Sequence, residues 1–169
     1  MPPHAPMEAW PDAKKSWSHL YADFAKPKKG ISFLILVDLY SKWPEVFHMK
    51  SSNASSTIRA LGEAFSRFGL PDTLITNNGP PFQSQEFQTF CLQNGIQHLF
   101  SPVYHTQSNG LAERFVDTFE RASHKMNTIT DEAKIRQFLF HYRNFFYSLS
   151  CYEQKTGRGT SGSRTTLCI

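Results

Sequence analysis

Alternating apolar and polar positions in the first third of the chain predict three β-strands. The runs are SHLYADFA at 18–25, ISFLILVD at 31–38 and WPEVFHM at 43–49. Between the first two lies KPKKG, in which a proline, a glycine and three lysines are typical of a hairpin connection. We therefore expect these strands to pair in antiparallel fashion.

From residue 53 onward the apolar spacing becomes helical. A helix is predicted from a cap at Asn53 or Ser55 to Gly69-Leu70-Pro71, with a stripe of Ile58, Leu61, Phe65 and Phe68. A short strand at 73–76 follows, then a helix that Ser84 can cap and that ends before Gly95. Residues 96–100 predict a further strand.

Two more helices complete the predicted order. After the polar loop SPVYHTQSNG, a long helix carries Leu111, Phe115, Phe119 and Ala122 on one stripe, and another runs from Asp131 to about Phe146. Three strands followed by alternating helices and strands indicate an α/β domain: a five-stranded mixed sheet with helices on both faces. We expect a lead-in at 1–16, one domain at 17–146 and a disordered Gly/Ser/Thr-rich tail at 147–169.

Composition limits the class of protein. A chain of 169 residues with 40% hydrophobic content suits one domain with a sizeable core, and no apolar run reaches membrane-spanning length. Three distant cysteines fit neither a disulfide framework nor a zinc pair, so we expect a soluble intracellular protein. The net charge of +4 arises within 114–169, where nine Lys/Arg face five Asp/Glu. That excess is compatible with a polyanionic partner, although a solvated surface explains it more simply.

Three polar positions stand out against this framework. Asp23 lies inside the first strand, Asn77 ends the fourth strand, and Glu113 lies near the start of the long helix, about 200° around the axis from Leu111 and Phe115. Strand ends and a helix start can converge in a mixed sheet, and carboxylates gathered there hold divalent cations. Singly, Asp23 could face solvent and Glu113 could be an ordinary helix residue, just as LITNNGPPF alone reads as a turn.

The surrounding segments give these positions a context. DFAKPKKGISFLILVDLYSKWPEV, FSRFGLPDTLITNNGPPFQSQEF and SPVYHTQSNGLAERFVDTF closely resemble the catalytic core of gypsy-type LTR-retrotransposon integrases, members of the retroviral-integrase-like DDE superfamily. That family has an Asp in the first strand, an Asp in D-N-G-P-x-F and a Glu in N-G-x-x-E-R. As in the family, 35 residues separate the last two positions, here Asn77 and Glu113. The resemblance covers about 17–145 and implies a ribonuclease H-like fold.

The resemblance also implies a catalytic site. In it, Asp23, position 77 and Glu113 would bind two Mg²⁺ or Mn²⁺ ions, which activate a nucleophile and stabilise the leaving oxygen in phosphoryl transfer to and from DNA. This chain departs from the pattern at Asn77, because an amide has replaced the second carboxylate and a full negative charge is lost. Asp38 and Asp72 are expected too far along their strands to compensate. The hypothesis is a catalytic core for DNA 3′-processing and strand transfer that retains its fold but has little or no activity.

Several partner residues follow from the same resemblance. The loop before Glu113 is expected to contact DNA through Tyr104, His105, Gln107, Ser108 and Asn109, with Arg114 beside it; the alternative is that Tyr104 packs and the others are merely solvated. Homodimerisation is expected from the family, and action on chromosomal DNA implies the nucleus. We expect no membrane association.

Two classes of function remain open from the sequence. The first is an integrase, impaired at Asn77; the second is a non-catalytic nucleic-acid-binding or interaction module derived from a retrotransposon integrase. A ribonuclease H-type nuclease fits less well, since it would require a further acid near the helical one. After Tyr142-Arg143-Asn144 the likeness fades, and neither a His₂Cys₂ zinc module nor a C-terminal barrel is recognisable, which is typical of a truncated element or a domesticated gene fragment.

Overall fold

The computed structural model describes residues 15–28, 30–101, 110–125 and 130–156. Their elements are, in order, β1 (His19–Lys28), β2 (Ile31–Asp38), β3 (Pro44–Met49), α1 (Ala54–Phe68), β4 (Thr73–Thr76), α2 (Pro80–Gln83), α3 (Gln85–Gln93), β5 (Gln97–Phe100), α4 (Gly110–Lys125) and α5 (Asp131–Thr156). None of the helices in these ranges combines the length and apolarity needed to cross a bilayer.

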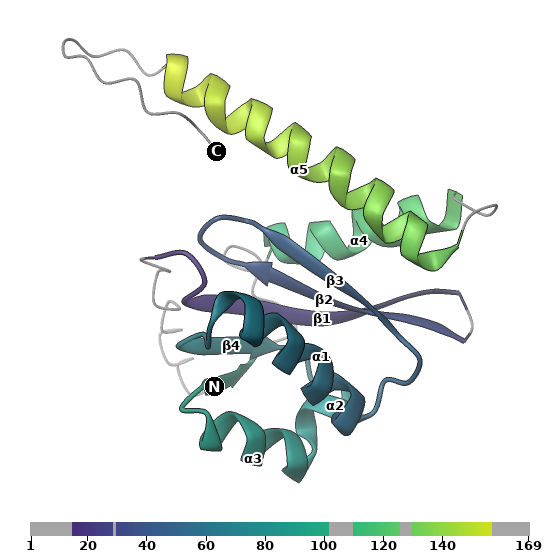
Figure 1. Cartoon of the computed structure of the whole chain (residues 1–169), viewed down its shortest axis with the longest axis vertical. Coiled ribbons are helices and arrows are strands. Elements are labelled where there is room, and N and C mark those ends of the chain that lie inside the picture. The colour runs from purple at the N-terminus through teal and green to yellow at the C-terminus, as the bar shows by residue number, and fades with distance from the viewer. Residues whose placement is uncertain (1–14, 29, 102–109, 126–129, 157–169) are drawn as a thin grey trace, which may run out of the picture.

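The strands form one mixed sheet in the order β3-β2-β1-β4-β5 (Figure 1). β1 pairs with β2 and β2 with β3 in antiparallel fashion, whereas β4 lies parallel to both β1 and β5. The predicted five-stranded mixed sheet and the antiparallel hairpins at its start are therefore confirmed. The parallel pairs follow from two crossovers: α1 carries the chain from β3, which runs in the same direction as β1, to β4, and α2 and α3 carry it from β4 to β5.

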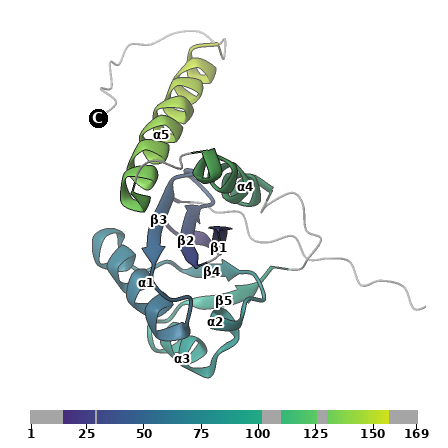
Figure 2. The ribbon, with the colours of Figure 1, turned by 90° about the vertical axis from the view of Figure 1, so that its right-hand side faces the viewer.

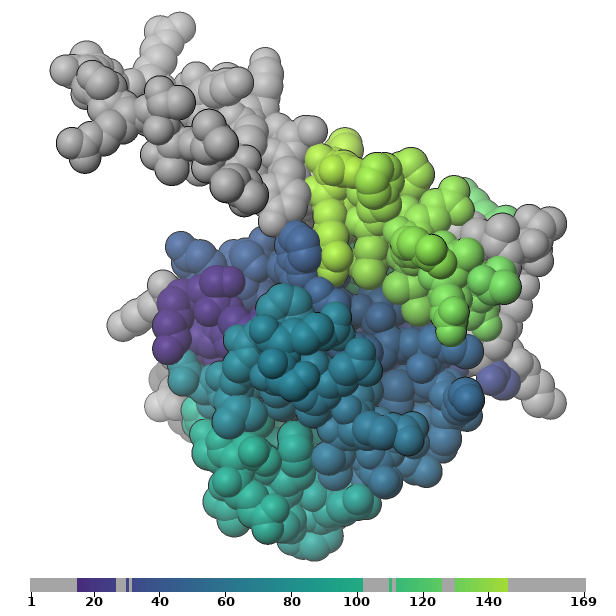
Figure 3. All heavy atoms as spheres, in the orientation of Figure 1, coloured from purple at the N-terminus to yellow at the C-terminus, as the bar shows by residue number. Residues whose placement is uncertain are grey.

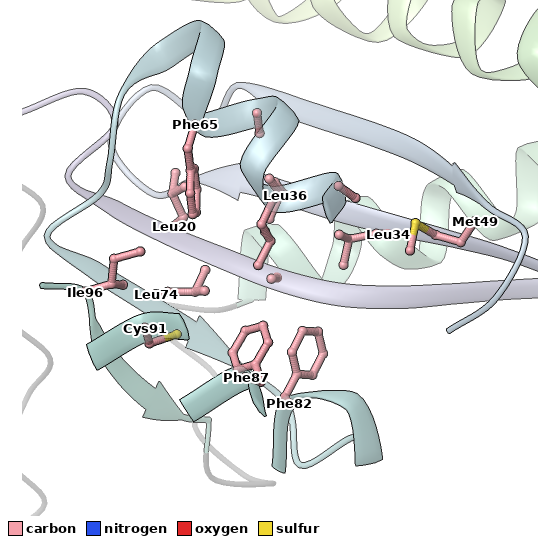
Figure 4. Packing of buried hydrophobic residues seen from close by; sticks show 14 residues of the cluster. Leu20, Leu34, Leu36, Met49, Phe65, Leu74, Phe82, Phe87, Cys91 and Ile96 are labelled. Atoms are coloured by element: carbon pink, nitrogen blue, oxygen red, sulfur yellow. The ribbon is translucent and has the colours of Figure 1, made fainter. Parts of the chain in front are cut away.

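Helices cover both faces of the sheet, as predicted (Figure 2). Because side chains alternate along a strand, Leu20 and Ala22 of β1 face α1 and α3, while Tyr21 and Ala25 face α4 and α5. On the first face a cluster of fully buried side chains fills the space between the sheet and the helices, as Figure 4 shows for Leu20, Leu34, Leu36, Leu74, Phe82 and Phe87, among others. The central strands are thus apolar on both sides.

Aromatic contacts hold α4 and α5 on the second face. The ring of Phe119 meets Phe33 of β2 edge-on, with 5.1 Å between ring centroids, and meets Phe138 of α5 at the same distance. Phe115 in turn contacts Tyr142 of α5 at 4.6 Å. These rings bury large apolar area and fix the rotation of α4, so its opposite side faces away from the core.

The helix caps follow the sequence signals. The Asn53 side chain accepts a hydrogen bond from the backbone N–H of Ser56, which identifies Asn53 rather than Ser55 as the cap of α1. Ser84 accepts one from Phe87 N–H at the start of α3. Gly69 ends α1 with φ of +89°, a backbone conformation that side chains with a Cβ rarely adopt.

Three elements differ from the expectation. β1 continues to Lys28 through part of the supposed hairpin loop, with a register irregularity between Ala25 and Lys28 where Pro27 lacks a backbone N–H for the ladder. The short α2 was not predicted; a proline in its first turn suits a helix start. α5 extends to Thr156, well past the expected end near Phe146. The division into lead-in, domain and tail stays a prediction.

Where α5 crosses the sheet edge, one arginine fastens it. The Arg143 guanidinium lies 3.9 Å from the ring centroid of Trp43, donates to the carbonyl of Pro44 and forms a 2.9 Å ion pair with Glu45. A cation that stacks and donates at once locks the helix to the start of β3. Figure 3 shows the surface of β3 lying between α1 and α5 on this side of the molecule.

Candidate active site

Asp23 and Asn77 lie side by side at the point where β1 and β4 run parallel. The last pair in that ladder is Ala22 with Thr76, and the residues that follow this pair along the chain are Asp23 and Asn77. Both follow residues of the second face, Tyr21 and Ile75, by two positions. Strand periodicity therefore directs both side chains toward α4.

Helix α4 brings Glu113 over the same point. Besides the aromatic contacts, the Glu120 carboxylate accepts a 2.8 Å hydrogen bond from the backbone N–H of Lys26, which ties the helix to the C-terminal part of β1. Asp23, Asn77 and Glu113 then line one cleft of about 400 Å³, together with Tyr21, Asn78, Ser101, Val116 and Asp117. Asn77 follows Asp23 by 54 positions, and 35 residues lie between Asn77 and Glu113, yet all three side chains line the same cleft.

The Asp23 carboxylate is surrounded by hydrogen-bond donors. Its Oδ1 accepts from the backbone N–H of Phe24 at 2.6 Å and from the Nδ2 of Asn77, and its Oδ2 accepts from the Tyr21 hydroxyl at 3.3 Å. The Oδ1 of Asn77 accepts from the backbone N–H of Gly79 at 2.9 Å. The centre of the site is therefore a connected network within the protein.

Burial dominates the electrostatics of this network. It raises the pKa of Asp23 from 3.8 to about 6; the Phe24 N–H and the Tyr21 hydroxyl oppose this rise, while Glu120 and Glu113 add to it. Burial, with the charges of Asp23 and Glu113, also raises the pKa of Tyr21 well above its ordinary value of 10. The Tyr21 hydroxyl consequently stays protonated and acts as a donor throughout the physiological range.

Sequence reasoning missed the five other cleft residues, of which Tyr21 and Asp117 are the titratable ones. Tyr21 precedes Asp23 by two positions and therefore shares its face of β1, a signal that strand periodicity offers. Asp117 follows Glu113 by one helical turn and shares its face of α4. Both were available from spacing alone, but neither residue type singles itself out in a strand or on an exposed helix surface.

A chain of hydrogen bonds from His98 through Thr76 holds the backbone carbonyl of Asn77. The Thr76 hydroxyl donates to the carbonyl of Asn77 at 3.0 Å, so the 2.9 Å contact between the Thr76 oxygen and His98 Nε2 requires that nitrogen to carry a proton. Burial lowers the pKa of His98, which favours the neutral ring. His98 on β5 thereby helps to set the position of the residue that follows β4.

The other predicted residues divide into two groups. Tyr104, His105, Gln107, Ser108 and Asn109 lie outside the described residues. Arg114 has an exposed side chain on α4, and it is not among the described residues that line the cleft.

Neither of the two aspartates weighed from the sequence, Asp38 and Asp72, replaces the lost acid. Asp38 pairs with Leu20 in the β1–β2 ladder and bonds Ser16 and Ser41, and Asp72 forms an ion pair with Lys15. Both lie toward the other end of the strands, as expected.

The donor set does not fit a pair of divalent cations. Hard dications need several anionic oxygens, whereas position 77, the second position of the expected set, presents the NH₂ of Asn77 toward Asp23. Within the described parts of the chain, no group of three His, Cys, Asp or Glu side chains is arranged to hold a metal ion. The expected ligand set thus retains two carboxylates, Asp23 and Glu113, and its other member is an amide that turns its NH₂ toward Asp23.

A second hollow, of about 630 Å³, lies between α1, β3 and α5. Basic side chains line it, including Lys50, Arg59 and Arg136, but Glu63 and Glu132 oppose them. This mixture of charges offers no concentrated field, and no predicted site residue lies there.

A mixed five-stranded sheet covered on both faces, with acidic side chains gathered where parallel strands meet a helix start, defines a ribonuclease H-like domain of the integrase-core type. The family model described as "Integrase core domain" matches residues 13–106. The chain belongs to this family.

Known relatives agree with this assignment. The chain is 40% identical over 146 residues to the Caenorhabditis elegans protein K02A2.6, covering 85% of this chain and 12% of that protein. It is 36% identical over 118 residues to the Pol polyprotein of radiation murine leukemia virus (strain Kaplan), covering 67% and 20%. The chain thus spans a fifth or less of the length of these relatives.

A solved structure shows the same architecture. The HTLV-2 integrase catalytic core domain in complex with magnesium, in its dimeric form, superposes with a TM-score of 0.60 at 28% identity, covering 74% of this chain and 85% of that one. The predicted ribonuclease H-like fold is therefore confirmed.

Proposed function

We propose that this chain is an integrase catalytic-core domain that engages DNA but performs little or no metal-dependent 3′-processing and strand transfer. One observation carries the proposal: in an integrase-core fold, Asp23 and Glu113 line a common cleft, but Asn77 stands beside Asp23 in place of a second acid. Without that negative charge the cleft does not bind the two cations that would stabilise the transition state of phosphoryl transfer.

A DNA-nicking assay in Mn²⁺ tests the proposal directly. Wild-type protein should give turnover near background, and Asn77→Asp should raise it. The gain should exceed the roughly 10–100-fold effect of losing an outer partner of a metal site, because a ligand itself is restored. Adding Asp23→Ala to Asn77→Asp should remove the gain.

Asn78→Asp is the matched control, since it adds the same charge one residue further along the chain, at an exposed position of the same cleft. It should not raise turnover. Robust nicking by the wild type, abolished by Asp23→Ala, would contradict the impaired-enzyme reading.

The neutral side chain at position 77 also favours a second function, a non-catalytic DNA-binding module on the same scaffold. Arg114 is the described residue that supports it, because its exposed guanidinium lies at the start of α4 beside the cleft. Fluorescence anisotropy with a DNA duplex in EDTA would measure binding without chemistry. Arg114→Ala should weaken binding and reduce the salt slope by about one.

Arg59→Ala serves as the control for that experiment. Arg59 is an exposed arginine of α1, on the opposite face of the sheet. Equal losses in both variants would point to non-specific charge, and no binding by the wild type would contradict the module.

Two broader expectations belong to the same proposal. The dimeric form of the HTLV-2 core supports homodimerisation, which sedimentation equilibrium would measure. Nuclear residence follows from action on chromosomal DNA, and imaging of a tagged protein would test it. The magnesium complex of the HTLV-2 core supports a metal-dependent ancestor for this site, where Mg²⁺ or Mn²⁺ would bind, and not a loaded site in the present chain.

A further inference from the structure

The side-chain amide of Asn77 is bonded at both ends. Its Nδ2 donates to Oδ1 of Asp23, and its Oδ1 accepts the backbone N–H of Gly79 at 2.9 Å. Gly79 belongs to the turn that starts α2, where φ is −63° and the N–H points back toward residue 77. The amide therefore links the end of β4 to β1 and to the next turn.

This bonding fixes which way the amide faces. Rotating it by 180° would place NH₂ against the Gly79 N–H, two donors together, and the carbonyl oxygen against the Asp23 carboxylate, two acceptors together. Both hydrogen bonds would be lost and both contacts would become repulsive. The Gly79 N–H thus forces the amide to present its donor, not its oxygen, to Asp23.

Asp23 is correspondingly supplied with donors from three directions. Phe24 N–H and Asn77 Nδ2 serve one oxygen, and the Tyr21 hydroxyl serves the other. A half-buried carboxylate ordinarily needs such partners or a counter-ion, because desolvation penalises its charge. Here the partners are all groups of the protein itself.

We propose that Asn77 is a positioning residue that takes the place of a cation: its amide holds Asp23, so the acidic centre is folded and satisfied without divalent metal. An aspartate at position 77 would keep the Gly79 N–H with one oxygen and turn the other toward Asp23. Two carboxylates would then face each other, with Glu113 nearby, and a bound cation would be needed to offset their repulsion. The inference stands on these hydrogen bonds and holds whether or not the domain cuts DNA.

Thermal melts in EDTA and in Mn²⁺ test this substitution, with Asn78→Asp as the control of equal charge. In EDTA, Asn77→Asp should melt about 4–8 °C below Asn78→Asp, from a lost charge-assisted hydrogen bond and a new repulsion. Mn²⁺ in about hundredfold excess over its Kd should raise the melting temperature of Asn77→Asp by roughly 5 °C or more. The wild type and Asn78→Asp should shift by less than about 1 °C under the same conditions, since a ligand without affinity for the fold does not stabilise it.

Two results would overturn the inference: an equal Mn²⁺ shift in the wild type and Asn77→Asp, or an Asn77→Asp protein that melts no lower than Asn78→Asp in EDTA. If Asn77→Asp is unfolded without metal, a Mn²⁺ titration followed by far-ultraviolet circular dichroism should show that the metal refolds it. Failure to refold would count against the inference. The melts need no DNA and no turnover. An inactive Asn77→Asp that Mn²⁺ still stabilises would therefore contradict the proposed function and leave this inference standing.

Discussion

The ionisation of Asp23 provides a direct measure of how the cleft is built. Burial raises its pKa to about 6 in the folded protein, so between pH 4 and 6 the folded state keeps a proton that the unfolded chain has released. Stability must therefore fall as pH rises through this window. Asp23→Asn removes the titration and keeps an oxygen for the Phe24 N–H.

The size of this effect follows from the two pKa values. The difference between about 6 and the ordinary 3.8 corresponds to at most ~3 kcal/mol, at about 1.4 kcal/mol for each pH unit. Water reaches part of the side chain, and the Asn77 amide favours the charged form, so both reduce that limit. We expect about 1–2 kcal/mol of pH-dependent stability from this one carboxyl.

Urea unfolding in EDTA at pH 4, 5, 6 and 7 measures it. The wild type should lose about 1–2 kcal/mol relative to Asp23→Asn across the series. Asp72→Asn removes one carboxylate at an exposed position outside the cleft, so it controls for the loss of a charge as such.

Parallel profiles for the wild type and Asp23→Asn would refute the reasoning, since they would mean that folding leaves the proton affinity of Asp23 unchanged. A wild type that gains stability relative to Asp23→Asn with rising pH would refute it more strongly. In that case the donors around the carboxylate would outweigh its burial.

Three further substitutions test the parts that hold the cleft. Gly79→Ala puts a Cβ 2.8 Å from Oδ1 of Asn77, and displacement of the amide should lower the melting temperature by about 2–4 °C despite the entropic advantage of alanine. Phe33→Ala empties the space beneath α4 and should cost about 3–5 kcal/mol in urea unfolding; a loss below 1 kcal/mol would contradict its place in the core. Glu45→Gln breaks the ion pair with Arg143 and should cost about 2 kcal/mol, with faster hydrogen exchange confined to α5; uniform exchange would argue against a local anchor.

The sequence went far toward the fold because its signals are local. Alternation along 31–38 and helical spacing around Phe65 fix strands and helices through backbone periodicity, and the caps at Asn53 and Ser84 mark helix starts. The end of α5 was missed because that stretch lacks a breaker and its apolar pattern weakens gradually. The extension of β1 through Pro27 was missed because a bulge restores pairing where the residue types suggest a turn.

The positions of the site were likewise readable in one dimension, since the spacing and context of Asp23, Asn77 and Glu113 matched a known pattern. What the amide does there was not readable. The sequence shows that Asn77 has lost a charge, whereas its orientation depends on a backbone N–H two residues later and on a carboxylate from another strand. Hydrogen bonds are directional contacts between groups remote along the chain, so only the tertiary structure decides that Asn77 offers its donor to Asp23 and that Tyr21 joins them.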